Sequence, residues 1–362
     1  KYRQEYNDNT LTGGAADGAY AITHIGEVLP TAIVHRDGPV AMFESAPMPE
    51  IEKVVATTDL GTMTLGEMMN DRRSRIRAIA VVHKGKLVYE NYIGIRPWDN
   101  HIWGSAAKSI VGLVSYLLEK EGKLDVSQTV VGHYMPQCRG PAWECVPGAN
   151  VRHQRSGLDI LAVELGAPKP PITLFYAIVA GAPGLPEYAS FFDAMKAVKK
   201  LREPGERFEY SSMNTMMMVM IAEQGLSPSG EPSAFGIFSS RLRDLARYGM
   251  LFTPSWNVVA KEPLVGDDYL PKVYSAAKKA AFAGNLGDRM IKGFGDLDMG
   301  ASYQWDAIFP DGDIYMSGRS GQCLYISPET DTVVVYFSAS YQSSLWVHAY
   351  AREIVKQVFR NK

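Results

Sequence analysis

A serine and a lysine separated by two alanines, Ser105 and Lys108, are the residues of this chain best suited to chemistry. Positions three apart share one face of a helix, so the Lys108 amine can approach the Ser105 hydroxyl. Apolar residues fill nearly every face of the following turns, which predicts a buried helix that ends near Gly122. Burial lowers the pKa of a lysine, and a neutral amine can accept the proton of a serine nucleophile. The N–H groups of the first helical turn favour an oxyanion there.

The same tetrapeptide, Ser-Ala-Ala-Lys, occurs again at residues 275–278. This copy continues into Lys279-Ala280-Ala281 without a large apolar stretch, which is typical of a solvent-exposed helix. The four letters alone are therefore weak evidence. The case for Ser105 depends on residues elsewhere in the chain.

Composition excludes several classes of function. With 362 residues, 46% of them hydrophobic, the chain can build a large core and is expected to form two lobes. The net charge of −2 and the absence of a long basic run argue against a nucleic-acid partner. No apolar run approaches the roughly 18–20 residues of a membrane span. Neither CxxC, HExxH nor EF-hand patterns occur, so we expect no metal and no cofactor.

The cysteines and the first residue of the chain give hints about the cellular compartment of the protein. Cys138 and Cys145 flank a turn-rich loop that a disulfide could close, and the alternative is two free thiols. A bridge would indicate an oxidising compartment. The chain begins at Lys1 rather than Met, as after removal of a signal peptide. We expect a periplasmic or secreted protein, with a cytoplasmic one as the alternative. Cys323 lies in an apolar run and is expected to be a buried thiol.

The elements that must position Ser105 come from both ends of the chain. Residues 77–92 have the pattern of a β-hairpin, and residues 64–72 that of a short helix. A helix is expected at residues 241–249, capped by Ser239 and Ser240. Residues 300–338 predict an antiparallel meander, and residues 345–359 a closing amphipathic helix. The irregular residues 1–60 are expected to wrap the outside of the core.

These elements predict an α/β (α+β) protein with an antiparallel sheet flanked by helices. Residues 1–122 and 235–362 would form one discontinuous sheet domain, and residues 123–234 an inserted, mostly helical domain. The active site would lie between them. Four methionines of the insert are expected to pack in its core: Met216, Met217, Met218 and Met220.

The order of three motifs resembles the serine β-lactamase and penicillin-binding protein superfamily. Ser105-x-x-Lys108 is followed by Tyr210-x-Ser212 and by a small-residue segment around Gly318. The pattern is most similar to the branch of class C β-lactamases, family VIII esterases and 6-aminohexanoate-oligomer hydrolases, over residues 65–360. Non-catalytic segments typical of the branch are Gly85–Glu90, Arg155–Asp159, Leu242–Gly249 and Ser327–Glu329. The resemblance implies a β-lactamase/transpeptidase-like fold.

The resemblance also implies roles for single residues. Ser105 matches the acylated nucleophile and Lys108 its general base. Tyr210 matches the tyrosine that relays the proton to the leaving group and later helps to activate water. We expect the nearby lysine to lower the pKa of Tyr210 from its usual value of about 10.

The third motif has two registers. In the first, Met316-Ser317-Gly318 fits the family pattern, and the N–H of Arg319 completes the oxyanion hole with that of Ser105. In the second, Arg319-Ser320-Gly321 takes that place and Gln322 supplies the N–H. We prefer the first, which makes Ser212, Ser317, Gly318 and Arg319 the substrate-binding candidates.

Two departures from the family pattern bear on the substrate. Met316 replaces the cation that holds a substrate carboxylate in the lactam-binding members, and Ser212 replaces the usual asparagine. Both favour an esterase or amide hydrolase over a β-lactamase or cell-wall peptidase. An aromatic loop that includes Tyr176 and Tyr188 is a candidate lid, with simple packing as the alternative.

These residues predict a serine hydrolase that cleaves an amide or ester of a small molecule, short linear oligomer or peptide through an acyl-Ser105 intermediate. β-Lactamase or D,D-peptidase activity is the first alternative. A non-catalytic binding or assembly protein on the same fold is the second. The sequence does not determine the oligomeric state.

Overall fold

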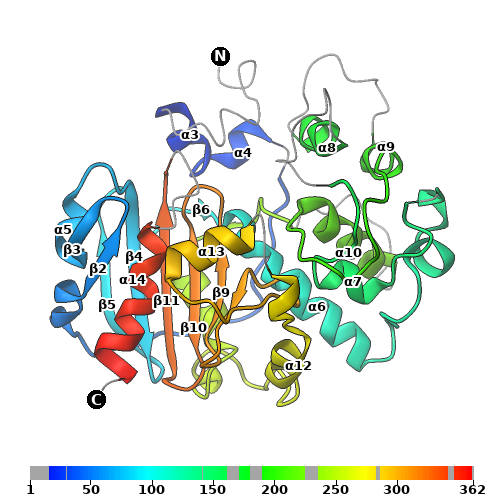
Figure 1. Ribbon diagram of the computed structural model, residues 1–362. Coiled ribbons are helices and arrows are strands. Elements are labelled where there is room, and N and C mark those ends of the chain that lie inside the picture. Colours follow the sequence, from blue (N-terminus) through cyan, green and yellow to red (C-terminus); the bar gives the residue numbers. More distant parts are fainter. Residues whose placement is uncertain are drawn as a thin grey trace.

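The computed structural model describes residues 16–29, 31–140, 142–160, 171–179, 190–224, 235–282, 286–340 and 346–360. A seven-stranded sheet carries helices on both faces, and a mostly helical region lies beside it (Figure 1). The mixed α/β class predicted from the sequence is confirmed. None of the helices in these ranges is long and apolar enough to cross a lipid bilayer.

Strands from both ends of the chain form the large sheet. Its order is β1-β5-β4-β11-β10-β9-β8, antiparallel except for the β1–β5 pair. The strands are β1 (Glu44–Ser45), β4 (Ile76–His83), β5 (Lys86–Tyr92), β8 (Ala307–Ile308), β9 (Ile314–Ser317), β10 (Cys323–Ser327) and β11 (Thr332–Ser338). Because β4 pairs with β11, the N-terminal hairpin and the C-terminal meander share one sheet, as predicted. Two small sheets pair β2 (Val55–Thr58) with β3 (Gly61–Thr64), and β6 (His101–Ile102) with β7 (Ser239–Ser240).

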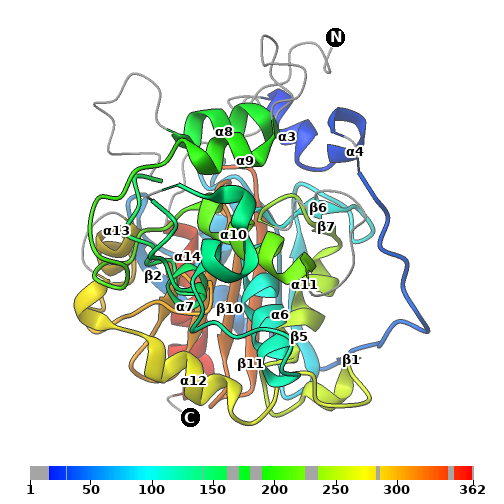
Figure 2. The ribbon, with the colours of Figure 1, turned by 90° about the vertical axis from the view of Figure 1, so that its right-hand side faces the viewer.

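Alternating side chains bury both faces of the large sheet. In β4, Ile79 and Val81 join one core, whereas Ala78, Ala80 and Val82 join the other. The first face is covered by α5 (Leu65–Asn70), α13 (Leu286–Phe294) and α14 (Trp346–Ile354). The second is covered by α6 (Lys108–Lys120) and α11 (Leu242–Met250), as Figure 2 shows.

The helical region has a core of its own. It contains α7 (Gly148–Arg152), α8 (Pro171–Val179), α9 (Phe191–Lys196) and α10 (Ser212–Gln224). The four methionines of α10 are buried in this core, as predicted. Val111 and Leu118 of α6 join it too, while Leu113 and Tyr116 face the sheet. The helix that follows Ser105 therefore packs against both regions and lies at their boundary.

The remaining helices lie at the periphery. They are α3 (Ala16–Ala21), α4 (Ile25–Val28) and α12 (Tyr269–Ala276), with short 3₁₀ or π turns between elements. Residues 31–43 form an exposed, irregular strap between α4 and β1, visible at the edge of the molecule in Figure 2.

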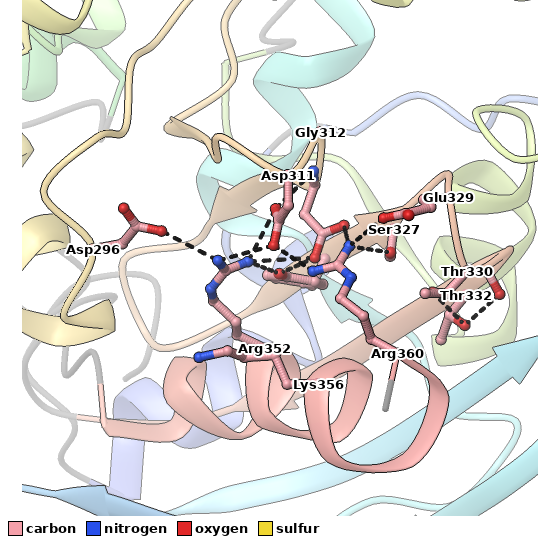
Figure 3. A network of polar contacts seen from close by, with 12 residues as sticks. Asp296, Asp311, Gly312, Ser327, Glu329, Thr330, Thr332, Arg352, Lys356 and Arg360 are labelled. Atoms are coloured by element: carbon pink, nitrogen blue, oxygen red, sulfur yellow. Dashed lines mark hydrogen bonds and ion pairs between the residues drawn. The ribbon is translucent and has the colours of Figure 1, made fainter. Parts of the chain in front are cut away.

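Ion pairs attach the C-terminal helix to the β8–β9 turn. Arg352 of α14 contacts Asp311 of this turn at 3.1 Å (Figure 3). Arg360 of the following turn contacts the buried Asp313 at 2.7 Å. Tyr325 donates a 2.5 Å hydrogen bond to Asp313 as well. Each carboxylate oxygen of Asp313 thus has a partner, as a buried charge requires.

Two local predictions are wrong. Ser239 and Ser240 do not cap α11; they form β7, and the residue that precedes the helix is Arg241, whose side chain makes no capping hydrogen bond. Cys138 and Cys145 are free thiols rather than a disulfide. Cys138 packs into the core of the helical region and Cys145 is exposed, so the two side chains lie in different environments. Cys323 is a buried thiol, as predicted.

Candidate active site

Ser105 lies in a 3₁₀ turn, Gly104–Ala107, that leads directly into α6. Gly104 has φ +55°, a left-handed conformation that glycine adopts without a steric penalty. The Trp103 N–H donates a 2.8 Å hydrogen bond to the Phe238 carbonyl, which anchors the turn to the segment before β7. Ser105 remains partly exposed at the start of an otherwise buried helix. A substrate carbonyl can therefore reach its hydroxyl.

Lys108 is completely buried behind this serine. Its Nζ donates hydrogen bonds of 2.9 Å to Ser105 Oγ and 2.6 Å to the Phe235 carbonyl. Burial lowers the pKa of Lys108 to about 7, although the negative charge of Asp306 raises it in part. The predicted decrease of the lysine pKa is thus confirmed. Near neutral pH a large fraction of Lys108 is the free amine that can accept a proton.

Tyr210 completes a compact group with these two residues. Lys108 Nζ lies 5.2 Å from the centre of the Tyr210 ring. The expected decrease of the tyrosine pKa is wrong, because burial and the negative charge of Asp306 raise it well above 10. The Ser105 hydroxyl and the charge of Arg319 act in the opposite direction but are weaker. Tyr210 therefore keeps its proton at neutral pH and is suited to donate it.

A buried glutamine fixes the backbone around Tyr210. The Glu209 N–H donates to the Gln154 carbonyl at 2.7 Å, and the Ser211 N–H donates to Gln154 Oε1 at 3.0 Å. Gln154 Nε2 in turn donates to Gln304 Oε1 at 2.7 Å. Both glutamines are buried, so this chain of hydrogen bonds joins the helical region to the segment before β8.

The third motif lies directly against the Ser105 turn. A Cβ atom on Gly318 would lie only 2.7 Å from the Trp103 carbonyl oxygen, and a Cβ atom on Gly104 only 3.3 Å from the Arg319 backbone nitrogen. Only glycines allow the two backbones this approach. The Arg319 backbone nitrogen thus lies against Gly104, the residue before Ser105, and its role as the oxyanion donor stays a prediction. Gln322, whose N–H is the donor in the second register, lies in the same turn, where its carbonyl accepts a 2.9 Å hydrogen bond from the Gly318 N–H.

Tyr176 and Ser212 meet at the entrance of α10. The Tyr176 hydroxyl lies 3.0 Å from Ser212 Oγ, and Ser212 is buried two residues beyond Tyr210. Tyr176 of α8 therefore lies near Tyr210, and its role as a lid residue stays a prediction. Tyr188 lies outside the described residues.

Comparisons with known proteins show what this chain is similar to. The Beta-lactamase family model matches residues 64–224, which include Ser105, Lys108 and Tyr210. The 6-aminohexanoate-dimer hydrolase of Paenarthrobacter ureafaciens is 24% identical over 355 residues, 90% of this chain and 86% of that one. The chain is thus similar, over residues 64–224, to the β-lactamase family of hydrolases.

Two solved structures place this hydrolase in the same fold. A Bacillus anthracis protein assigned as a 6-aminohexanoate-dimer hydrolase superposes with a TM-score of 0.75 at 18% identity, over 98% of this chain and 97% of that one. A class C β-lactamase superposes with a TM-score of 0.56 at 14% identity, over 82% of this chain and 97% of that one. At such identities these likenesses show the shared fold.

One residue of the site of this hydrolase was missed by sequence reasoning. Asp306 is fully buried between Trp305 and β8, and its charge acts on both Lys108 and Tyr210. It is about 200 positions away from Ser105 in the sequence and belongs to none of the three motifs. The sequence feature that could have indicated Asp306 is its acidic side chain within residues 300–338, which were expected to form buried strands.

The second Ser-Ala-Ala-Lys segment of the hydrolase has none of these features. Ser275 and Lys278 are exposed, and α12 ends at Ala276. Ser275 Oγ donates to the Lys272 carbonyl at 3.1 Å. Its interpretation as a solvent-exposed segment is confirmed. Within the described ranges, no group of three or more His, Cys, Asp or Glu residues could hold a metal ion.

Proposed function

We propose that this protein hydrolyses an amide or ester bond of a small linear substrate through a covalent acyl-Ser105 intermediate. The observation that carries the proposal is the 2.9 Å contact between Ser105 Oγ and the amine of Lys108, whose side chain is fully buried. Burial favours the neutral amine, and a neutral amine in contact with a hydroxyl is a competent general base.

Acylation begins when Ser105 Oγ attacks the substrate carbonyl carbon and its proton passes to Lys108 Nζ. The backbone N–H groups of Ser105 and Arg319 stabilise the oxyanion that forms. Tyr210 donates its proton to the leaving nitrogen or oxygen and is reprotonated from Lys108. The bond between the carbonyl carbon and the leaving group then breaks, and the acyl group stays on Ser105.

Deacylation repeats these steps with water. Lys108 and Tyr210 take a proton from a water molecule that attacks the acyl carbon. The same N–H groups hold the second oxyanion, and its collapse breaks the bond to Ser105 Oγ. Ser105 recovers its proton, and the acid product leaves.

The side chain at position 316 supports a linear substrate rather than a lactam. Met316 is apolar and fully buried where the lactam-binding members of the family place a cation. The curated relative named above is a 6-aminohexanoate-dimer hydrolase, an enzyme named for a linear substrate. We therefore propose short linear amides as the substrate class, with simple esters of the same acyl groups as reactive analogues.

A substrate panel tests this proposal. Wild-type protein and Ser105→Ala are assayed with the 6-aminohexanoate dimer, with p-nitrophenyl esters of short acids and with the lactam nitrocefin. We expect the wild type to turn over the linear substrates faster than nitrocefin, and Ser105→Ala to be inactive. Rapid turnover of nitrocefin alone would establish the β-lactamase alternative instead.

The non-catalytic alternative has its own outcome. A fluorophosphonate reacts only with an activated serine, so a binding protein on this fold would leave the reagent unreacted. We expect one equivalent of label, located on Ser105. An unlabelled protein that is inactive on every substrate of the panel would refute the enzymatic proposal.

A further inference from the structure

Asp306 is a buried carboxylate with only one of its oxygens engaged. Oδ2 accepts hydrogen bonds from the Ser317 N–H at 3.0 Å and from Ser317 Oγ at 2.5 Å. Oδ1 is buried too, and it accepts no hydrogen bond within the part of the chain that the structure describes. A buried charge with an unpaired oxygen costs free energy, so its retention calls for a physical reason.

The charged and titratable groups around Asp306 show what it acts on. Its charge raises the pKa values of Lys108 on α6, Tyr210 before α10 and Tyr315 on β9. Burial raises the pKa of Asp306 itself to about 6, while the hydrogen bonds from Ser317 and the charge of Lys108 lower it in part. Arg319, in the turn after β9, acts on Tyr210. At neutral pH Asp306 is therefore largely ionised, and its charge acts on a lysine that is only partly protonated.

We propose that Asp306 is a positioning residue of the Ser105 site, which stabilises the protonated form of Lys108 and holds Ser317 beside the oxyanion donor. This inference rests on the proposed function and adds a fourth side chain to it. Asp306 is fully buried, so it acts through Lys108 and Ser317 rather than by contact with substrate.

The effect through Lys108 follows from the balance of charge during acylation. Before the reaction, the buried pair is a neutral amine and a carboxylate. Once Ser105 Oγ has bonded to the carbonyl carbon, its proton sits on Lys108 and makes a buried ammonium. Without Asp306 this cation would have to form in a medium that solvates it poorly. A fixed negative charge nearby lowers the energy of that state, as the aspartate of a Ser-His-Asp triad does for its imidazolium.

The effect through Ser317 follows from its place in the chain. Ser317 is the last residue of β9 and directly precedes Gly318 and Arg319, whose backbone lies against the Ser105 turn. Two hydrogen bonds to one carboxylate oxygen fix this strand end. The N–H of Arg319 is thereby held where the oxyanion develops.

The pH dependence of acylation in Asp306→Asn tests the proposal. The measurement is the second-order rate constant for acylation by p-nitrophenyl acetate between pH 5 and 9. We expect the rate above pH 8 to fall by about tenfold to a hundredfold, because one preorganised charge is lost. We also expect the acidic limb of the pH–rate profile, where the rate falls as Lys108 becomes protonated, to move to lower pH by about one unit. The reason is that loss of an opposite charge shifts the pKa of Lys108 by at least that much. The ratio of variant to wild-type rate would then be about five times larger at pH 6 than at pH 8.5.

A matched control is Asp313→Asn. Asp313 is equally buried and lies on the same β8–β9 hairpin, but its partners are Arg352 and Arg360. This variant should lose thermal stability and keep the acidic limb of the wild type. A shift of the limb in Asp313→Asn equal to that in Asp306→Asn would overturn the proposal, because any buried carboxylate would then have the same effect.

Ser317→Ala separates the two parts of the role. It keeps the charge of Asp306 and removes one hydrogen bond, so it should lower the rate above pH 8 with a smaller shift of the limb. Asp306→Ser replaces the asparagine variant if that one does not fold. An unmoved limb in whichever uncharged variant folds contradicts the proposal, as does a Ser317→Ala variant with full wild-type rate.

Failure of the inference can be told apart from failure of the proposed function. Acylation of Ser105 in the wild type, combined with an unmoved limb in Asp306→Asn, removes the role of Asp306 and leaves the hydrolase mechanism intact. No acylation of wild-type Ser105 refutes both.

Discussion

The tetrapeptide Ser-Ala-Ala-Lys occurs twice in this molecule with opposite outcomes. At Ser105 it joins a 3₁₀ turn to the buried helix α6, and the lysine side chain has no exposed surface. At Ser275 it spans the end of helix α12, where Ser275 and Lys278 are exposed and the lysine lies beyond the last helical residue. Identical residues at identical spacing thus give the proposed nucleophile and base in one place and a surface segment in the other.

The environment of Lys108, rather than the motif, lowers the pKa of its amine. Burial around Lys108 lowers its pKa to about 7. The helix also continues past Lys108, so its side chain stays on the face of Ser105, whereas α12 ends before Lys278. The following predictions test this contrast.

The largest difference between the two copies should appear in the serine variants. Ser105→Ala should lower the hydrolytic rate by about 10⁴-fold or more, because loss of a nucleophile removes the covalent route. Ser275→Ala should keep the wild-type rate. Both are measured as kcat/KM on a p-nitrophenyl ester. Equal rates in the two variants would mean that Ser105 has no special role.

The lysine variants should differ in both activity and stability. Lys108→Met should lower kcat/KM by about 10³-fold, because a general base contributes 10²–10⁴. The same variant should melt at a higher temperature at pH 7, because it no longer buries an amine. Lys278→Met should change neither quantity.

The sign of the stability effect depends on pH. Lys108 has a pKa of about 7 in the folded protein and an ordinary one when unfolded, so the unfolded chain binds the extra proton between pH 7 and about 10. Wild-type stability from this group therefore rises with pH across that window. The advantage of Lys108→Met, followed by thermal unfolding, should be full below pH 7 and shrink towards pH 10. A constant advantage would contradict burial of a neutral amine.

Removal of the tyrosine hydroxyl should have a smaller effect. Tyr210→Phe should lower kcat/KM for an amide by about 10²-fold, since the leaving nitrogen needs a proton. The loss should be smaller for a p-nitrophenyl ester, whose leaving group departs as an anion. Tyr336→Phe, which changes another buried tyrosine, is the control and should keep full activity. Equal losses on both substrates would exclude proton donation by Tyr210.

The smallest effect is expected at the glycine before the nucleophile. A Cβ on Gly104 would lie 2.8 Å from Gln322 Oε1 and 3.0 Å from Gly318 Cα, so Gly104→Ala must separate the Ser105 turn from the third motif. We expect a loss of about 2 kcal/mol in unfolding free energy from strain and crowding, and about a tenfold loss of activity. Gly122→Ala has φ +70° but open space around the new methyl group, so it should cost stability alone. Equal activity in both variants would show that the contact with Gly318 does not matter.

Local patterns predicted much of this molecule. The hairpin pattern of residues 77–92, the short helix expected at residues 64–72 and the apolar run after Lys108 each depend on a few neighbouring residues, and each gave the correct element. The three motifs around Ser105, Tyr210 and Gly318 were recognised because their order resembles that of a known superfamily.

Predictions that depended on the tertiary environment were less successful. Ser239 and Ser240 have cap-forming side chains, yet pairing with His101 and Ile102 made them a strand. The pKa of Tyr210 rises rather than falls, because burial and Asp306 outweigh the nearby cations. Asp306 itself could not be found, since its importance lies in a charge acting across two regions of the chain.

The most direct test of the account is the site of acylation. Wild-type protein is mixed with a p-nitrophenyl ester, quenched in acid within the first turnover and digested, and the mass of each peptide is measured. If Ser105 is the nucleophile, we expect one acyl group per chain, on the peptide that contains Ser105, and none on the peptide that contains Ser275. Hydrolysis without an acylated Ser105, or an acyl group that persists in Ser105→Ala, would contradict it.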